Sequence, residues 1–299
     1  MSSKWKLIAE EAARKVYEHQ DGQTVLLVAG DEMPDFDEKL GVTIPGKGRM
    51  LTKMSKYWFD QTESMVPNAY AATKFGSVDK NSYLELELNS ETVTPMLKLD
   101  MLPIEAIVRG YIAGDMWAFY AEGFKDFCGI TLGKHLKNGE RLTEPIFTPV
   151  AKSSDGELDQ NLSFDEMIGW LESRGVMGAA DRTKLIREYS IKLYNLAHDR
   201  LLKKGIILAD ARFEFGINPL TGNIMLGSEL FTSDSSRFWS LKDYEIGKEQ
   251  KSLDKQIIRD WVVEHPDERV TKAVLEKAAI VYSRLSDAVV DEKYARTFF

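Results

Sequence analysis

Cysteine is nearly absent from this chain of 299 residues, in which Cys128 is the only one. A lone thiol forms no disulfide within the chain and supplies no thiolate cluster for zinc. Histidine is also scarce, and its four copies are scattered without the spacing of metal ligands. The sequence therefore excludes an internal disulfide and indicates no zinc centre.

Long apolar runs and blocks of basic residues are missing as well. No segment approaches the length of a membrane-spanning helix, and the N-terminus has no apolar core of the kind found in secretory signals. The formal net charge of -8, with no basic block, disfavours binding to nucleic acid. We therefore expect a cytoplasmic protein whose partners are small molecules, with no nucleic-acid or membrane partner. The sequence leaves the oligomeric state open.

The composition itself is that of an ordinary globular protein, because 43% of the residues are hydrophobic and 29% are charged. A chain of this length buries either one large core or two unequal lobes. It contains no internal repeat, low-complexity tract or long linker. The functional signals must therefore be read from single segments.

The segment from residue 205 to 239 carries the clearest pattern in the chain. Residues 206–209 are an apolar run suited to a buried strand, and residues 210–217 alternate between polar and apolar side chains. Turn-forming residues follow at 218–223, and residues 223–228 return as a second strand. This pattern predicts a β-hairpin followed by a loop.

The first strand of this hairpin has one polar face. The alternation places Asp210, Arg212 and Glu214 on that face and leaves the other to apolar side chains: Phe213, Phe215 and Ile217. Ser228 and Glu229 lie at the exit of the hairpin. Carboxylates two residues apart suit a hard cation such as Mg²⁺. The simpler interpretation is the exposed polar face of an antiparallel sheet.

The loop after the hairpin holds Ser235, Ser236 and Arg237, whose two hydroxyls and guanidinium suit an anion. The segments ILADARFEFGI (207–217) and SELFTSDSSRFW (228–239) together resemble the SAICAR synthetase (phosphoribosylaminoimidazole-succinocarboxamide synthase) family. Members of that family join aspartate to a carboxylated aminoimidazole ribotide and split ATP. The resemblance covers nearly the whole chain and matches the longer, yeast-like form of the family.

The resemblance implies an α+β fold with antiparallel sheets and flanking helices, in the two-lobed, ATP-grasp-like arrangement of the family. Residues 1–95 would form an N-terminal lobe that resembles the nucleotide lobe. Residues 96–299 would form a larger lobe that carries the substrate and metal sites. The cofactors implied are ATP and Mg²⁺, and the cleft between the lobes would hold the site.

Site residues follow from the resemblance position by position. Catalytic roles fall on a polar set: Lys152, Asp210, Arg212 and Glu214. The substrate-binding positions are Arg109, Asp115, Asp159, Ser235, Ser236 and Arg237. The nucleotide would contact Arg14, Leu99 and Met101, because apolar side chains and backbone groups suit a flat heterocycle. The metal would be held by Glu214 and Glu229.

The nucleotide and metal motifs depart from the family pattern. The family turn G-K-x-K/R-x-x-Y begins here with Glu11 and Ala12, so Arg14 alone keeps a positive charge. Read without the family, residues 10–18 (EEAARKVYE) are a good helix segment. Ser228 replaces one of two metal-binding acids, and the strand position of Glu229 points away from the site.

The substrate motifs depart as well. In the family segment V-V-R-x-Y-x-x-G-S, the arginine and the final serine hold a 5′-phosphate. Arg109 is kept here, but the serine position is Asp115. A carboxylate facing Arg109 and Arg237 would repel a dianionic phosphate, unless Asp115 turns out to solvent. Val150 and Ala151 also replace the two hydroxyl residues that precede Lys152.

Because the departures fall on phosphate, metal and hydroxyl positions, they predict a diverged SAICAR synthetase-like enzyme. It would descend from an ATP-dependent amide ligase and act on a different small anionic substrate in specialised metabolism, with nucleotide and Mg²⁺ binding weakened or lost. Two alternatives stay open. One is a genuine SAICAR synthetase of purine biosynthesis, and the other is an ATP-independent lyase, cyclase or binding protein that reuses the cleft.

The remaining segments predict scaffold. We expect strands at 24–29, 83–88 and 92–97, and an amphipathic helix after the turn at 44–49, where Lys47 and Arg49 read most simply as solvated charges. The clearest helix runs from Asp181, which can cap it, to Lys204, and a last helix covers about residues 271–285.

Overall fold

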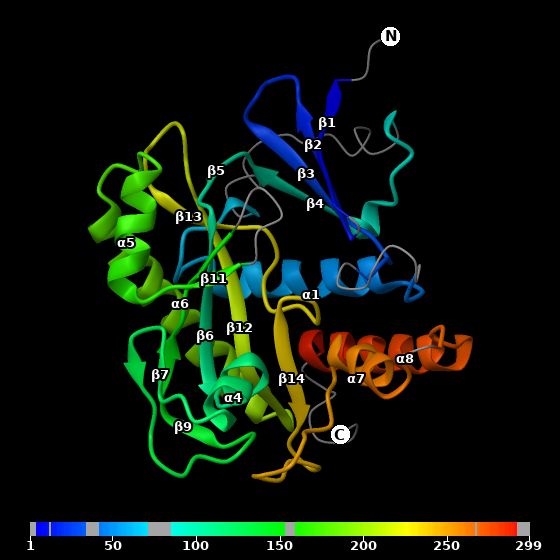
Figure 1. The fold of residues 1–299 in the computed structure, drawn as a ribbon. Coiled ribbons are helices and arrows are strands. Elements are labelled where there is room, and N and C mark those ends of the chain that lie inside the picture. Colours follow the sequence, from blue (N-terminus) through cyan, green and yellow to red (C-terminus); the bar gives the residue numbers. More distant parts are fainter. Residues whose placement is uncertain are drawn as a thin grey trace.

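The structure is a computed structural model that describes residues 4–11, 13–33, 42–70, 85–152, 159–266 and 268–291. Its described strands form two main antiparallel sheets, one of four strands and one of eight, together with a two-stranded ribbon of β7 (Asp126–Phe127) and β8 (Ile130–Thr131) (Figure 1). Helices pack against both sheets. The expected α+β class with antiparallel sheets is therefore confirmed.

The smaller sheet has the strand order β1-β2-β3-β4. Its strands are β1 (Trp5–Glu11), β2 (Arg14–His19), β3 (Thr24–Ala29) and β4 (Val93–Leu97). The strands expected at 24–29 and 92–97 are confirmed. The predicted boundary between residues 95 and 96 falls within β4 and stays a prediction.

The helical interpretation of residues 10–18 is wrong, because this segment contributes to two paired strands. Glu11 lies opposite Arg14 at the end of the β1–β2 ladder, and Tyr17 of β2 pairs with Leu26 of β3. Leu26 is fully buried, and Tyr17 packs against the same apolar cluster. Pairing and burial outweigh the helix propensity of Glu, Ala and Arg.

The strand expected at 83–88 is also not found in its described part. Residues 83 and 84 lie outside the described residues. Residue 85 is helical, residues 86 and 87 form a turn, and residue 88 has no regular structure. Glu87 has a φ of 52°, which no strand accommodates. A short 3₁₀ helix, η1 (Ser90–Thr92), then leads into β4.

The larger sheet is built around β12 (Ile206–Ile217), which pairs with β6, β13, β14 and β5. These neighbours are β6 (Ile104–Tyr111), β13 (Ile224–Gly227), β14 (Ser236–Ser240) and β5 (Asp100–Met101). The outer strands are β9 (Arg141–Phe147), β10 (Val150–Ala151) and β11 (Gln160–Asn161). The predicted hairpin is thus confirmed as β12–β13, and Phe213 and Phe215 are fully buried on its apolar face.

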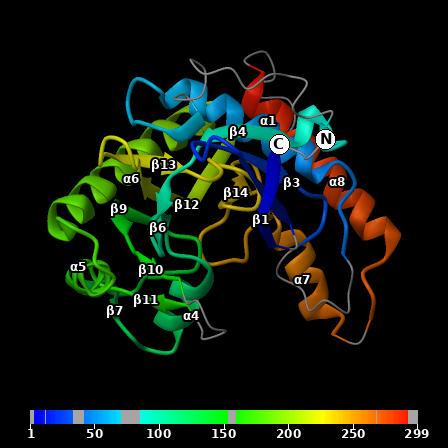
Figure 2. The same cartoon turned by 90° about the horizontal axis from the view of Figure 1, so that it is seen from above.

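Helices pack on the apolar face of the larger sheet and on one another (Figures 1 and 2). Helix α5 (Phe164–Ser173) packs on the long α6 (Ala179–Leu202), which lies on β12 and β6. The C-terminal end of α6 meets α1 (Lys47–Thr62), because Arg200 donates to Gln61, and α1 packs in turn on α8 (Lys272–Val290), which also contacts α7 (Gln256–Glu264). Helix α1 contacts β3 and β4 and also places Trp58 against Phe231 of the larger lobe. This helix therefore joins the two sheets.

The helix ends refine the sequence predictions. Helix α6 begins earlier than expected, with Gly178 in the left-handed conformation (φ 67°) as its cap, so Asp181 lies in the first turn instead of capping. The negative charge of Asp181 in the first turn still interacts favourably with the positive end of the helix dipole. The last helix, α8, is capped by the side chain of Thr271 and extends to Val290. None of the described helices is both long and apolar enough to cross a membrane.

Candidate functional site

A cleft of about 700 Å³ lies where the two sheets meet. One end is lined by apolar side chains from both sheets: Ile8, Val16, Val25, Leu27, Met96, Leu99 and Met101. The other end is charged, with six of the residues expected in the site: Arg14, Lys152, Asp159, Arg212, Glu214 and Glu229. An apolar slot that opens onto a charged end suits a ligand with a flat ring and an anionic tail.

Two glycines shape the apolar end of this cleft. A Cβ atom on Gly216 would lie 2.7 Å from the Cβ of Leu99, and one on Gly227 would lie 3.1 Å from the sulfur of Met101. Any larger residue at either position would push the segment that carries Leu99 and Met101 away from β12. Leu99 and Met101, the two predicted nucleotide-contact residues, therefore fit into the cleft lining because the strands that face them carry glycine at these positions.

The charged end is held together by Arg14, which reaches from β2 toward the end of the β12–β13 hairpin. Its Nη1 atom donates to the Ser228 hydroxyl at 2.9 Å, and its Nη2 atom lies 2.6 Å from a carboxylate oxygen of Glu229. The same guanidinium is 3.9 Å from Glu214, which also pairs with Lys152. Burial alone would raise the pKa of Glu214, but Lys152 and Arg14 outweigh it and hold that pKa below its usual range.

The predicted direction of Glu229 is wrong. Strand β13 ends at Gly227, and Ser228 adopts a left-handed backbone with a φ of 59°. The alternation of a strand therefore stops before Glu229, whose carboxylate turns toward Arg14. The second oxygen of Glu229 accepts a hydrogen bond from the Thr232 hydroxyl at 2.6 Å.

A second group of charges forms a row across three neighbouring strands. Asp210 of β12 lies opposite Arg109 of β6 on one side and opposite Arg237 of β14 on the other. Arg237 donates to Asp210 at 2.6 Å. Arg109 turns instead to Asp115, with bonds of 2.7 and 3.0 Å, and to the Thr148 hydroxyl at 3.0 Å. The expected proximity of Asp210 and Arg237 is confirmed.

Asp115 is therefore bound by one guanidinium and not shared between two. Its side chain is 56% exposed, yet both carboxylate oxygens are engaged by Arg109, which is only 3% exposed. Burial raises the pKa of Asp115, but Arg109, Arg212 and Arg237 reverse that effect and leave it lowered. The carboxylate thus stays charged and neutralises Arg109.

Gly114 allows this row to close against α4 (Gly114–Ala121). Its φ of 58° favours glycine, and an added Cβ would lie 2.6 Å from Nη2 of Arg237. The guanidinium of Arg237 therefore lies directly on the backbone that precedes Asp115. This contact ties the 109–115 segment to β14.

The row lies beside the cleft and not within its lining. Five predicted residues belong to it or its borders without lining the cleft: Arg109, Asp115, Asp210, Ser236 and Arg237. Arg212 lies between the two groups. It lines the cleft and pairs with Glu105 at 3.0 Å, and although burial would lower its pKa, the nearby charges of Glu105, Asp210 and Asp115 raise it. Ser235 lines the cleft and bonds to Thr232, whereas the buried Ser236 hydroxyl has no hydrogen-bond partner among the described residues.

Sequence reasoning missed a buried ion pair beneath the cleft. Lys47 is fully buried and donates to Asp234 at 2.6 Å, so its interpretation as a solvated charge is wrong, whereas Arg49 is 60% exposed as expected. Asp234 lines the cleft and also accepts from the Tyr282 hydroxyl at 3.2 Å. Nothing near Lys47 in the sequence signals this burial, because its partner is 187 residues away.

Asp254 is another buried acid that the sequence did not single out. It lies near Arg237 and accepts backbone hydrogen bonds from Phe238 at 2.7 Å and Gln256 at 2.9 Å. Burial raises the pKa of Asp254 to about 6, against the attraction of Arg237 and the two backbone donors. This carboxyl therefore titrates in a mildly acidic range.

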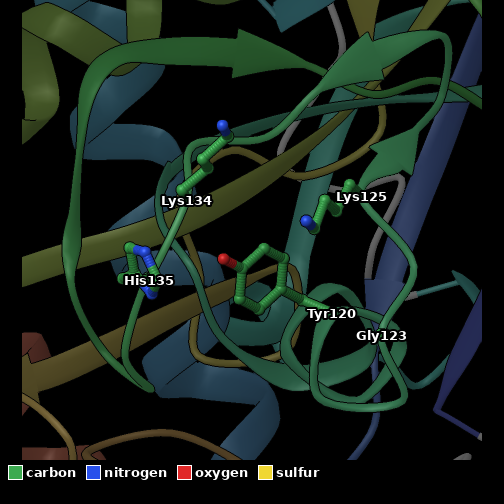
Figure 3. A pocket seen from close by; sticks show the side chains of 5 residues that line it. All are labelled: Tyr120, Gly123, Lys125, Lys134 and His135. Atoms are coloured by element: carbon green, nitrogen blue, oxygen red, sulfur yellow. The ribbon is translucent and has the colours of Figure 1, made fainter.

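A smaller hollow of about 310 Å³ is formed by the end of α4 and the segment that follows it (Figure 3). It is lined by Tyr120, Gly123, Lys125, Lys134 and His135, so all of its lining comes from one stretch of chain. The three basic side chains belong to exposed residues, and no carboxylate lines the hollow. Its lining contains no acid–base pair and no nucleophile arranged beside a base, so the hollow does not compete with the cleft as a reaction site.

The cleft carboxylates do not present a ready Mg²⁺ site. Among the described residues, no three histidine, cysteine, aspartate or glutamate side chains gather as metal ligands. Glu214 and Glu229 both face Arg14, and Ser228 offers a hydroxyl in place of a third acid. Because Mg²⁺ requires several oxygen ligands in a strict octahedron, this set fits a guanidinium better than a metal.

Comparison with known proteins gives one consistent family. Residues 7–276 match the family described as SAICAR synthetase. A phosphoribosylaminoimidazole-succinocarboxamide synthase of Lachnospira eligens is 38% identical over 99% of both chains. Among solved structures, the SAICAR synthase of Saccharomyces cerevisiae complexed with SAICAR is 30% identical, with a TM-score of 0.79 over 97% of this chain and 96% of that one. A type-2 SAICAR synthetase in complex with ADP, 23% identical, shares the fold with a TM-score of 0.67 over 97% of this chain and 99% of that one.

These matches run almost from end to end and agree with the residues that first suggested them. The fold is that of solved SAICAR synthases, and the family is one of enzymes that act as ligases. The chain therefore belongs to the SAICAR synthetase family.

Proposed function

We propose that this protein joins the carboxyl group of a carboxylated aminoimidazole ribotide to the amino group of aspartate at the expense of ATP, in purine biosynthesis. The end-to-end match to a named synthase at 38% identity supports this reaction over the diverged enzyme that the motifs predicted. The observation that carries the proposal is the cleft itself, with an apolar slot at one end and paired charges at the other.

The nucleotide would lie with its ring in the apolar slot beside Leu99 and Met101. Its phosphates would then point toward Arg14 and Lys152, which line the same cleft. Both side chains are cationic, so they offset the negative charge of the phosphates. Their pairing with Glu214 and Glu229 fixes where they stand before the ligand arrives.

The chemistry would proceed in two steps. A carboxylate oxygen of the ribotide attacks the γ-phosphorus of ATP, the bond to the β-phosphate oxygen breaks, and ADP leaves. The aspartate nitrogen then attacks the activated carbonyl carbon, an amide forms, and inorganic phosphate leaves with the loss of one proton from nitrogen. Lys152 and Arg14 stabilise charge on the transferred phosphoryl group. The cleft carboxylates of Glu229 and Glu214 face these two cations of the chain itself.

The test is a reconstituted reaction with ATP, aspartate and the carboxylated ribotide, followed by mass spectrometry of the product and a separate measurement of ADP. We expect equal amounts of ADP and succinocarboxamide product, and neither when one substrate is left out. Lys152→Met should reduce the rate by at least about a hundredfold, because it removes one of the two cations on the phosphoryl path. ADP without the amide product, or no ADP at all, would contradict the proposal.

A second candidate is favoured by one observation, the bidentate pair between Arg109 and Asp115. A neutralised guanidinium suits a carboxylate, hydroxyl or amine better than a dianionic phosphate. The same fold would then act on a substrate that lacks the 5′-phosphate. A thermal-shift comparison of the ribotide with its dephosphorylated ribonucleoside separates the two candidates, because only the second predicts stronger stabilisation by the nucleoside.

A further inference from the structure

We propose that the guanidinium of Arg14 is the built-in cation of this cleft, standing between Glu214, Glu229 and Ser228 where a divalent metal would otherwise bridge protein and ligand. Nucleotide binding would then depend on Arg14 and little on added metal. This inference rests on the proposed use of a nucleotide, and its test includes a measurement without one.

Three of the four carboxylate oxygens of Glu214 and Glu229 already lie within hydrogen-bond distance of a donor of the chain. One oxygen of Glu229 lies 2.6 Å from Arg14, and its other oxygen accepts from the Thr232 hydroxyl at 2.6 Å. One oxygen of Glu214 pairs with Lys152, and its other lies 3.9 Å from Arg14. A metal would have to displace cations of the chain to reach either carboxylate.

Ser228 contributes a neutral acceptor to the Arg14 guanidinium. The Ser228 hydroxyl accepts from Nη1 of Arg14 at 2.9 Å, while Nη2 of the same fork is directed at Glu229. An acidic residue at this position would add a negative charge and an oxygen ligand for a metal. The neutral Ser228 hydroxyl instead acts, together with Glu229, as one of two acceptors for the planar guanidinium of Arg14.

The charges of the four side chains around the Ser228 hydroxyl balance one another. Arg14 and Lys152 carry two positive charges, and Glu214 and Glu229 carry two negative charges, so this group of four is neutral without a metal. Their side chains are between 16% and 39% exposed, which leaves them open to a ligand while limiting the water that would screen them. A guanidinium has five N–H donors, so it can bind protein carboxylates and a phosphate oxygen at once.

The ligand class that follows is a nucleoside triphosphate bound through its free phosphate oxygens. The experiment is a calorimetric titration of ATP in buffer with EDTA and in buffer with MgCl₂. For the natural protein we expect dissociation constants within about threefold of each other. Arg14→Gln should weaken binding in EDTA by at least about tenfold, and part of that loss should return with MgCl₂, because the freed carboxylates can then accept the metal.

Two variants control for simple loss of charge or structure. Lys15→Gln removes the neighbouring cation, which pairs with Glu10 on the exposed side of the same strands, and should leave both constants unchanged. Arg14→Lys keeps the charge but loses the planar fork, so its binding in EDTA should fall between that of the natural protein and that of Arg14→Gln. Circular dichroism of each variant checks that the hairpin still folds.

A nucleotide-free titration separates this inference from the proposed function. Mn²⁺ followed by electron paramagnetic resonance should show no site in the natural protein and a new site in Arg14→Gln/Ser228→Asp. A natural protein that binds Mn²⁺ at these carboxylates, or binds ATP at least tenfold better with MgCl₂, overturns the inference and leaves the proposed reaction intact. Absence of ATP binding in every buffer overturns the proposed reaction, and the Mn²⁺ result still decides whether Arg14 excludes the metal.

Discussion

The two charged regions of the site are held in different ways. The row of Arg109, Asp210 and Arg237 belongs to adjacent strands of one sheet, so the strand register alone brings these residues together. The contact between Arg14 and Glu229 instead joins the smaller sheet to the larger one. The first region can change only if the sheet changes, whereas the second depends on how two sheets pack.

This difference separates stability from binding. A pair fixed by strand register is formed once on folding, and breaking it leaves a buried charge in the sheet. A pair between sheets, at the mouth of a cleft, can exchange one partner for a ligand at little cost to the fold. We therefore expect substitutions in the row to affect mainly the free energy of unfolding, and substitutions at Arg14 to affect mainly the ligand.

The largest effect should come from Asp210→Asn, which keeps the shape of the side chain and removes its charge. Asp210 is 8% exposed and lies opposite arginines of both neighbouring strands, so its loss removes the carboxylate to which Arg237 donates within the sheet. We expect the free energy of unfolding in denaturant to fall by about 3 kcal/mol.

The matched control is Lys248→Gln, which breaks an exposed pair with Glu245. That substitution should leave the unfolding midpoint where it is in the natural protein. Equal effects of the two substitutions would remove the distinction between pairs in the sheet and pairs on the surface.

The next effect concerns pH and Asp254, which lies behind the row. Its pKa is raised from 3.8 to about 6, so between these values the folded state keeps a proton that the unfolded state has released. Its contribution to stability is therefore greatest at low pH and declines as the pH rises through this window. The difference in unfolding free energy between the natural protein and Asp254→Asn should change by about 2 kcal/mol from about pH 4 to 6. Parallel pH curves for the two proteins would contradict the raised pKa.

The central hairpin was largely predictable from the sequence, because its signal lies within one segment. Residues 206–217 show an apolar run and then strict alternation, and they form one strand with Phe213 and Phe215 in the core. Local periodicity was sufficient for this strand. The pairing of Asp210 with Arg237 lay outside that pattern, because the sequence predicted a loop at Arg237, whereas Arg237 lies in β14 directly opposite Asp210.

The hairpin end was less predictable, because its structure depends on distant partners and on one backbone conformation. Strands β1 and β2 carry helix-forming residues and exist as strands through pairing with β3. The direction of the Glu229 side chain depends on the left-handed backbone of Ser228, which the alternation of polar and apolar residues did not predict. The burial of Lys47 depends on Asp234 far along the chain.

A smaller effect should follow from Asp115→Ser, which returns a hydroxyl to the position beside Arg109. The substitution removes the carboxylate that binds both ends of the Arg109 guanidinium and so frees that cation for a phosphate. Affinity for the carboxylated ribotide should rise by about tenfold, the equivalent of about 1.4 kcal/mol, in a direct binding titration. The dephosphorylated nucleoside serves as the control, because its affinity should not rise. Tight binding of the ribotide by the natural protein, unchanged by the substitution, would return Asp115 to a structural role.

The smallest effect on stability should come from Arg14→Gln, although it removes a pair as short as that of Asp210 and Arg237. The Arg14 side chain is 22% exposed at the mouth of the cleft, compared with 11% for the Asp210 side chain, so less burial is lost when Arg14 is replaced. Thr232 also continues to donate to Glu229. We therefore expect a loss of less than about 1 kcal/mol in the free energy of unfolding, measured by denaturant titration beside Asp210→Asn. A loss as large as that of Asp210→Asn would mean that Arg14 locks the two sheets together, and the cleft would then be a fixed interior and not an exchangeable binding site.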